Sequence, residues 1–267
     1  MYINLGLIGN PLNHTLSPLI HTHFLYETNL NGGYTCFDIE NNCLDNIVEM
    51  FRKYLFVGVN VTVPFKCDIM RFCDNIDDTV KSMGAVNTLH FSNGIISGYN
   101  TDIYGFSKIF EENNIKVSDK TVLLLGAGGA SRAALKFFKD NKPKKLYFAN
   151  RTIEKALELK DFFNVDTSVI DMQSVDDIEC DIVVNSTSLG IKNEAFPYKA
   201  KVREYAIDMQ YKPYITSFLS LYNNEKEIVK INGISMLIWQ AYKSFNIWTG
   251  KTFNPNIEKL KYIMYNN

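Results

Sequence analysis

The chain of 267 residues predicts an α/β fold of one or two domains. Short apolar runs alternate with helical patterns over most of its length, as in parallel sheets covered by helices. One such run, residues 122–125, is rich in leucine and ends abruptly in glycines, which is typical of a strand buried on both faces. Hydrophobic residues make up 46% of the sequence and supply an ample core for one or two domains.

Charge, apolar content and cysteine spacing argue against several classes of partner. The net charge is −1, which indicates no nucleic-acid partner, and no apolar run approaches the ~18 residues that span a bilayer. The five cysteines form no C-x-x-C pair, so we expect reduced thiols rather than disulfides or a zinc site. The N-terminus lacks a signal-peptide pattern. We therefore expect a cytoplasmic protein without a metal or a membrane partner, and leave monomer and homodimer open.

The N-terminal part predicts two strand–helix alternations. A strand at residues 3–9 precedes a helix with Ser17 as N-cap and Pro18 as its first residue. Thr15 and Ser17 place two hydroxyls beside free helix N–H groups, a natural site for a carboxylate, although a simple capped helix is the alternative. A strand at 34–39 and an amphipathic helix around 43–54 follow.

Residues 56–66 alternate valine with polar residues, the period of a strand. Asn60 and Thr62 therefore share one face, and Lys66 follows where a new helix begins. Two polar groups and a lysine at one end of a strand fit a hydroxyl-rich ligand. The competing interpretation is an exposed strand face without a function.

A hairpin comes next, because Asn93-Gly94 separates two alternating runs, 86–91 and 95–99. A helix through residue 110 then begins at Asn100-Thr101-Asp102, with Thr101 or Asp102 as N-cap.

The glycine-rich turn has the spacing of a dinucleotide-binding unit. Gly126, Gly128 and Gly129 lie between the strand at 122–125 and a helix at 131–141, and a second strand spans 145–149. Glycine lets a pyrophosphate approach the N–H groups of a helix N-terminus. The third glycine of the usual fingerprint is replaced by Ser131.

The end of the second strand favours NADP over NAD. NAD-binding units place an acid there, whereas this chain has Asn150, Arg151 and Thr152, with Lys155 one turn later. A guanidinium suits a 2′-phosphate, which it can hold with two parallel hydrogen bonds. An ordinary exposed helix start is the alternative.

The remaining chain continues the alternation. A helix at 152–163 and strands at 167–170, 181–185 and 204–208 precede two helices, 236–248 and 256–265. Gln240 lies within an otherwise apolar helix face.

Several blocks together resemble the shikimate dehydrogenase family over nearly the whole chain. In order they are NVTVPFK (60–66), GAVNT (84–88), GYNTD (98–102), GAGGASRA (126–133), NRT (150–152), NSTSLG (185–190), residues 208–213, and NGISMLIWQA (232–241).

The resemblance implies a fold and an activity. It implies an N-terminal α/β substrate domain, residues 1–102 plus 236–267, to which the C-terminal helices return. A Rossmann-type NADP-binding domain would span residues 103–235. The implied reaction is the reversible NADPH-dependent reduction of 3-dehydroshikimate to shikimate, a step of aromatic amino acid biosynthesis.

The resemblance also assigns roles to residues. Lys66 and Asp102 would be the catalytic pair, and Thr15 and Ser17 would hold the substrate carboxylate. The ring hydroxyls and the carbonyl would be held by Asn60, Thr62, Asn87, Asp102 and Gln240. Tyr211 and Gly233 would line the cleft between the domains, with Tyr211 contacting the substrate. Cofactor contacts would come from Gly126, Ala127, Gly128, Gly129, Ala130, Asn150, Arg151, Thr152, Lys155, Thr187 and Gly233.

Two departures from the family pattern are Thr15, where serine is frequent, and Asn232, where aspartate is frequent. No histidine lies among the matching blocks, so Lys66 is the best candidate proton donor, with Asp102 orienting it. Three other functions stay open: a quinate/shikimate dehydrogenase of broader specificity, a non-catalytic sensor of shikimate-like acids, and an NADP-dependent reductase of another substrate.

Overall fold

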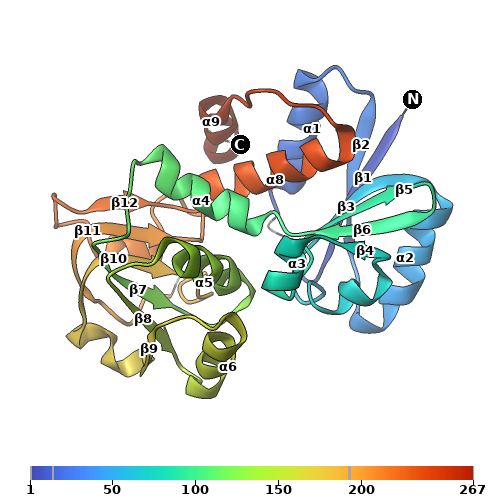
Figure 1. Ribbon diagram of the computed structural model, residues 1–267. Helices are drawn as coiled ribbons and strands as arrows, with labels where there is room; N and C mark the ends of the chain where they lie inside the picture. The colour runs from blue at the N-terminus through green and yellow to red at the C-terminus, as the bar shows by residue number, and fades with distance from the viewer. Residues whose placement is uncertain (1, 14, 192–193, 267) are drawn as a thin grey trace. The chain divides into compact units, whose positions relative to one another are not determined.

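A computed structural model of the protein describes residues 2–13, 15–191 and 194–266 (Figure 1). The chain divides into two compact units. The first unit comprises Met1–Gly105 together with Ile238–Asn267, and the second comprises Phe106–Leu237. The first unit is therefore built from two separate stretches of sequence.

The first unit contains a six-stranded mixed sheet in the order β2-β1-β3-β5-β6-β4. The strand β1 pairs in parallel with β2 and β3, whereas β5 runs antiparallel to β3 and β6. The predicted hairpin turn is confirmed, since Asn93 and Gly94 have φ of 51° and 78°, as a type I′ turn requires. The strands are β1 (Ile3–Gly9), β2 (Gly32–Asp38), β3 (Phe56–Val61), β4 (Asn75–Ile76), β5 (Thr88–Ser92) and β6 (Ile95–Tyr99).

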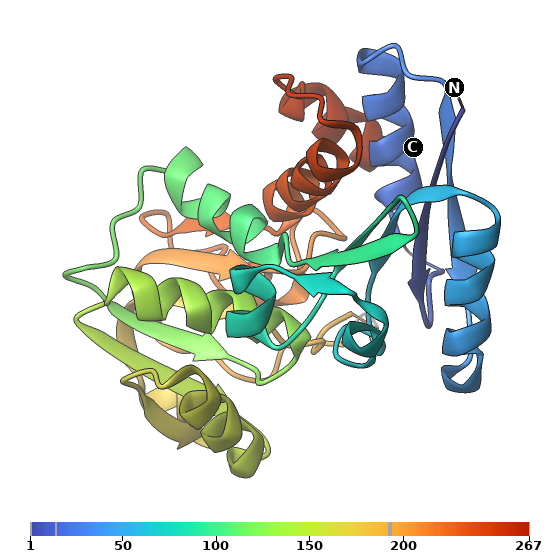
Figure 2. The same cartoon turned by 45° about the vertical axis from the view of Figure 1, so that its right-hand side comes forward.

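Helices from both ends of the chain meet in the first unit. The ring of Phe24 on α1 packs edge-on against Phe245 on α8, with centroids 5.6 Å apart, and Figure 2 shows the two helices side by side. Trp248 of α8 donates to the carbonyl of Leu89 at 2.8 Å. The helices are α1 (Ser17–Glu27), η1 (Asn41–Cys43), α2 (Leu44–Lys53), η2 (Asp68–Phe72), α3 (Asp78–Met83), α8 (Ile234–Thr249, which begins in the second unit) and α9 (Ile257–Asn266).

Two local predictions in the first unit are wrong. Leu16 is the N-cap of α1, no side chain caps the helix, and Ser17 is its first residue instead of the cap. The strand β3 ends at Val61, before the valine alternation stops at Val63, because Pro64 lacks the N–H group that a continuing strand needs, and the helix expected at 64–66 begins only at Asp68. Residues 62–66 turn instead, with Phe65 donating to the carbonyl of Thr62 at 3.0 Å, before η2.

The second unit contains a six-stranded sheet in the order β12-β11-β10-β7-β8-β9, and all its pairings are parallel. Renumbered from β7, this is the 3-2-1-4-5-6 order of the dinucleotide-binding fold, with its switch point between β7 and β10. The predicted α/β class with a Rossmann-type domain is confirmed. The strands are β7 (Thr121–Leu125), β8 (Lys145–Asn150), β9 (Ser168–Asp171), β10 (Glu179–Asn185), β11 (Lys201–Asp208) and β12 (Val229–Ile231).

The glycine turn leads directly into α5, which begins at Gly129, two residues earlier than predicted. Buried side chains of β7, β10 and β11, such as Leu123, Val183 and Ala206, form the core between the sheet and its helices. The helices are α4 (Asp102–Glu112, which begins in the first unit), α5 (Gly129–Asn141), α6 (Ile153–Phe163), η3 (Met172–Asp177) and α7 (Ser217–Ser220). None of the helices in the described part of the chain is long and apolar enough to cross a membrane.

Candidate functional site

A lysine–aspartate ion pair lies at the carboxyl end of the first unit's central strands. Lys66 follows the turn after β3, and Asp102 is the first residue of α4. The Lys66 Nζ lies 2.6 Å from the Asp102 Oδ2, and their side chains are only 20% and 10% exposed. Because a charge-assisted pair of this kind is shielded from water, both groups hold a defined position.

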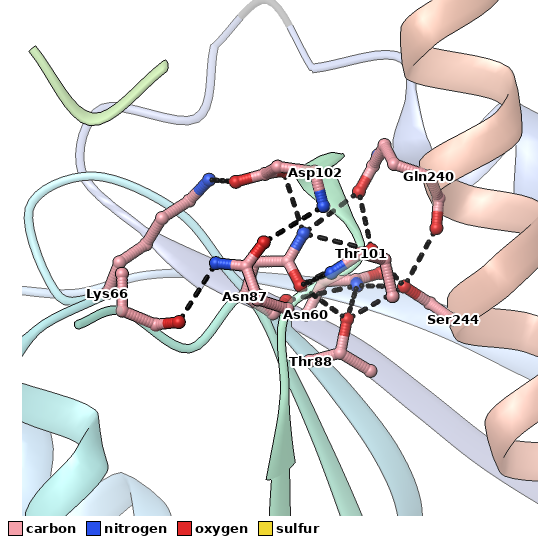
Figure 3. A network of polar contacts seen from close by, with 10 residues as sticks. Asn60, Lys66, Asn87, Thr88, Thr101, Asp102, Gln240 and Ser244 are labelled. Atoms are coloured by element: carbon pink, nitrogen blue, oxygen red, sulfur yellow. Dashed lines mark hydrogen bonds and ion pairs between the residues drawn. The ribbon is translucent and has the colours of Figure 1, made fainter. Parts of the chain in front are cut away.

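Asn87 holds the other oxygen of this carboxylate. Its Nδ2 donates to Asp102 Oδ1 at 2.8 Å, and its Oδ1 accepts from the backbone N–H of Thr101 at 2.8 Å. A backbone N–H only donates, so the Asn87 oxygen must face Thr101 and the amide nitrogen must face Asp102. The Oε1 of Gln240 lies 3.3 Å from the same nitrogen. The structure thus brings Lys66, Asn87, Asp102 and Gln240 together (Figure 3).

Asn60 lies behind this group and is almost fully engaged. Its Nδ2 lies within 3.2 Å of three acceptors, the Asn87 carbonyl and the hydroxyls of Thr88 and Ser244. Its Oδ1 accepts from the Tyr34 hydroxyl at 2.8 Å. Only Oδ1 keeps a lone pair, so Asn60 can accept a hydrogen bond from a ligand hydroxyl but has no amide hydrogen left to donate.

Thr62 lies outside that network, and the hydroxyls at α1 lie at its edge, where the Ser17 side chain bonds that of Tyr34. Thr62 follows the end of β3, its N–H donates to Ile8, and its half-buried hydroxyl makes no hydrogen bond within the described residues. The Thr15 hydroxyl lies 3.2 Å from that of Ser17 and also accepts from the Ser17 N–H at 3.3 Å. Two adjacent hydroxyls therefore stand at the N-terminus of α1, where helix N–H groups lack helical partners.

His21 was not predicted to have any role at this site. Its ring is fully buried and stacks on Tyr34, with centroids 4.4 Å apart and planes 5° apart. Burial lowers the pKa of His21 to about 3, although the nearby Asn60 side chain offsets this slightly. Neither ring nitrogen meets the distance and angle of a hydrogen bond with any of the described residues. His21 is therefore neutral at physiological pH, and it supports the ring that holds Asn60.

In the second unit, the glycine turn presents an open backbone. An added Cβ at Gly128 or Gly129 would meet no atom within 4 Å, and Gly129 begins α5. Gly126 has φ of 97°, and a Cβ there would come within 2.7 Å of the Thr187 side chain. The Ala127 N–H donates to Asn150 Oδ1 at 3.0 Å. The turn and the N–H groups from Gly129 and Ala130 onward fit a pyrophosphate.

The basic residues at the end of β8 are exposed and available to a ligand. Arg151, Thr152 and Lys155 are all exposed. Neither Arg151 nor Lys155 forms an ion pair with another described residue. Cations at this strand end fit a 2′-phosphate.

A buried aspartate connects the loops after β10 and β11. Asp208 Oδ1 accepts from Asn185 Nδ2 at 2.9 Å, and Asn185 Oδ1 accepts from the Thr187 N–H and hydroxyl at 3.0 and 2.7 Å. Burial raises the pKa of Asp208 to about 6, while a hydrogen bond from Thr216 acts in the opposite direction. Thr187 is thus fixed beside Gly126.

The remaining predicted residues follow β11 and β12. Tyr211 is half-buried, and burial raises its pKa. The Gly233 N–H donates to the Gln210 carbonyl at 2.9 Å, and a Cβ at Gly233 would lie 2.1 Å from the Met209 oxygen. Close backbone approach therefore requires glycine at 233. Within the described residues, no group of three His, Cys, Asp or Glu side chains could hold a metal ion.

Comparison with known families agrees with this geometry. The shikimate dehydrogenase substrate binding domain matches residues 7–89, the shikimate/quinate 5-dehydrogenase domain matches residues 107–204, and the shikimate 5′-dehydrogenase C-terminal domain matches residues 233–256. The chain belongs to the shikimate dehydrogenase family. Among family members, the NADP(+) shikimate dehydrogenase of Nitrosopumilus maritimus is 39% identical over 92% of both chains.

Two solved structures of the shikimate dehydrogenase family are similar in fold. A chorismate mutase/shikimate 5-dehydrogenase fusion protein from Clostridium acetobutylicum has a TM-score of 0.90 and 32% identity, over 100% of this chain and 98% of that one. Shikimate 5-dehydrogenase from Thermus thermophilus, solved with NADP(H) and shikimate, has a TM-score of 0.87 and 29% identity, over 98% and 99% of the chains.

Proposed function

We propose that this protein catalyses the reversible NADPH-dependent reduction of 3-dehydroshikimate to shikimate in aromatic amino acid biosynthesis. The observation that carries the proposal is the shielded Lys66–Asp102 pair, which Asn87 holds next to Gln240. When bound, the nicotinamide cofactor transfers the hydride, so the chain itself must move a proton and orient the substrate.

Lys66 is the proposed proton donor to the oxygen formed from the substrate carbonyl. An ammonium group carries three hydrogens, of which Asp102 engages one at 2.6 Å. Asp102 holds the lysine in place, and Asn87 fixes the carboxylate through its other oxygen. In the reverse direction Lys66 takes the proton back.

The other first-unit residues are proposed to bind the substrate. Thr15 and Ser17 hold the carboxylate at the N-terminus of α1, where the free N–H groups favour an anion. Asn60, Thr62, Asn87 and Gln240 hold the ring hydroxyls, with Asn60 acting as an acceptor. The first unit is therefore the proposed substrate domain, and its contact-based limits lie within three residues of the predicted ones.

The second unit is the proposed NADP domain. The turn from Gly126 to Ala130 holds the pyrophosphate, and Asn150, Arg151, Thr152 and Lys155 hold the adenosine ribose and its 2′-phosphate. Thr187 and Gly233 line the nicotinamide side, whereas Tyr211 is proposed to contact the substrate. The described cysteines are unpaired, which supports a reducing compartment such as the cytoplasm.

A single spectrophotometric comparison tests the proposed function. Absorbance at about 340 nm, where reduced nicotinamide absorbs, is followed with shikimate or quinate, each with NADP or NAD. We expect the highest kcat/KM for shikimate with NADP. Comparable turnover of quinate with NAD would assign the broader specificity instead, and binding of shikimate without turnover would indicate a sensor.

Arg151→Ala should raise KM for NADP by about 10- to 150-fold, the loss of a charge-assisted contact of roughly 1.5–3 kcal/mol, and leave KM for NAD nearly unchanged. The reason is that NAD has no 2′-phosphate for the guanidinium to hold. Lys144→Ala, one residue before β8, is the matched control for loss of an exposed charge. Equal effects on both cofactors would reject the 2′-phosphate contact.

Ser17→Ala should raise KM for shikimate by about 10-fold or more, with little change in kcat, because the carboxylate is remote from the reacting carbon. Ser17 does not cap α1, so the melting temperature should stay close to that of the wild type. A lower melting temperature with an unchanged KM would show that the hydroxyl serves only the helix.

A further inference from the structure

A fully buried hydroxyl connects the elements that carry the proposed substrate-binding groups. Ser244 lies on α8, one helical turn after Gln240, and its side chain is not exposed. Its Oγ lies 3.0 Å from Asn60 Nδ2, 2.8 Å from Thr88 Oγ1 and 3.1 Å from Thr101 Oγ1. One atom thus contacts β3, β5 and the segment before α4 (Figure 3).

Chemistry identifies Asn60 and Thr88 as donors in this cluster. The Asn87 Oδ1 only accepts, so at 2.9 Å the Thr88 hydroxyl must donate its single hydrogen to it. Ser244 carries one hydrogen and lies within reach of two acceptors, the Thr88 hydroxyl at 2.8 Å and the Gln240 carbonyl at 3.0 Å, so it can donate to either. The Asn60 Nδ2 only donates, so Ser244 accepts from Asn60. Ser244 and Thr88 therefore connect Asn60 to Asn87 through consecutive hydrogen bonds.

This chain leads to the reacting pair. Asn87 connects the hydroxyl cluster to the ion pair. Its Oδ1 accepts from Thr88, its Nδ2 donates to Asp102, and Asp102 contacts Lys66. Asn60, Asn87 and Thr88 are at most 6% exposed, so no bulk water can replace a missing partner. Loss of the Ser244 hydroxyl would take one of three acceptors from the Asn60 amide and one partner each from the Thr88 and Thr101 hydroxyls, which would loosen the orientation of these groups.

We propose that Ser244 and Thr88 are positioning residues for the reaction, which orient the amides of Asn60 and Asn87 and, through Asn87, the Asp102 carboxylate. This inference rests on the proposed function of the Lys66–Asp102 pair. Neither hydroxyl acts on the substrate directly; each acts through an asparagine.

Ser244→Ala tests the proposal in the full-length protein. We expect kcat/KM for shikimate to fall by about 5- to 30-fold, because Asn60, Thr88 and Thr101 each lose a buried hydrogen-bond partner. KM for NADP should stay within about twofold, since the second unit is unchanged. Thr249→Ala is the matched control: its hydroxyl also bonds the carbonyl four residues earlier on α8, that of Phe245, but it has no partner in the cluster.

Thr88→Val removes the other hydroxyl with a side chain of the same shape. We expect the same fall in kcat/KM for shikimate, so this variant tests the proposal even if Ser244→Ala does not fold. Where both fold, the double variant should lose less than the product of the two single losses, because the hydroxyls act as one chain. Wild-type kcat/KM in either folded variant, or equal losses for shikimate and NADP, would overturn the proposal. An inactive wild-type protein would instead refute the proposed function.

Discussion

Lys66→Ala should lower kcat for shikimate oxidation by roughly 10²- to 10⁴-fold, the usual contribution of a positioned general acid or base. KM for shikimate should change little, because the lysine acts on the reacting oxygen and the carboxylate is held elsewhere. Steady-state kinetics with saturating NADP measures both constants. Lys81→Ala removes an exposed lysine that pairs with Asp78 at 3.0 Å, and it is the matched control.

Asp102→Asn should also lower kcat, since the amide cannot hold the ammonium group by charge. The Lys66→Ala/Asp102→Asn double variant should lose less than the product of the two single losses, as residues that act as a unit do. The assignment fails if Lys66→Ala keeps wild-type kcat across the whole pH profile. In that case Lys66 would be a binding residue only.

Acid should unfold the first unit because of His21. Burial lowers the pKa of this ring from 6.5 to about 3 in the folded state, so the folded state binds fewer protons than the unfolded state between those values. Its contribution to stability is therefore complete above pH 6.5 and is lost as the pH falls toward 3. The full effect is on the order of 5 kcal/mol, at about 1.4 kcal/mol for each pH unit between the two values.

The stability of the second unit should change with pH in the opposite direction, because of Asp208. Burial raises the pKa of this carboxyl from 3.8 to about 6, so its contribution is present below pH 3.8 and is lost as the pH rises through 6. The change is roughly 2–3 kcal/mol. The two units should therefore differ in the sign of their pH dependence between about pH 4 and 6.

Tryptophan fluorescence separates the two responses. Both tryptophans, Trp239 and Trp248, lie in the first unit, so denaturant unfolding followed by their emission reports that unit. His21→Phe should reduce the loss of stability on acidification, and Asp208→Asn should leave the fluorescence-detected transition unchanged. If His21→Phe retains the wild-type pH dependence, another group is responsible.

Local signals were sufficient for the dinucleotide unit and for the hairpin. The leucine run of β7 with its glycine turn, and Asn93-Gly94 between alternating residues, specify their conformations within a few positions. The end of β3 was predicted wrongly because valine alternation continues past Val61, whereas Pro64 limits the strand. Short elements such as α7 and β12 have no periodic pattern long enough to detect.

The residues of the site also fall into those that the sequence predicted and those that it did not. Family motifs predicted Lys66, Asn87 and Gln240, and the structure brings these three together. His21 and Ser244 were not predicted, because their importance arises from contacts with residues far away in the sequence. Ser244 lies 184 positions from Asn60. Its one signal was a polar residue on the buried face of α8, a helical turn from Gln240.

The division of the first unit into two stretches has a consequence for synthesis on the ribosome. The second unit is one continuous segment and can fold as soon as it emerges. The sheet of the first unit is made earlier, yet the α8 side chains that complete it, such as Phe245 and Trp248, are translated after the entire second unit. The nascent N-terminal segment therefore exposes an apolar helix face and unsatisfied polar groups throughout that interval, a period in which chaperones have a surface to bind.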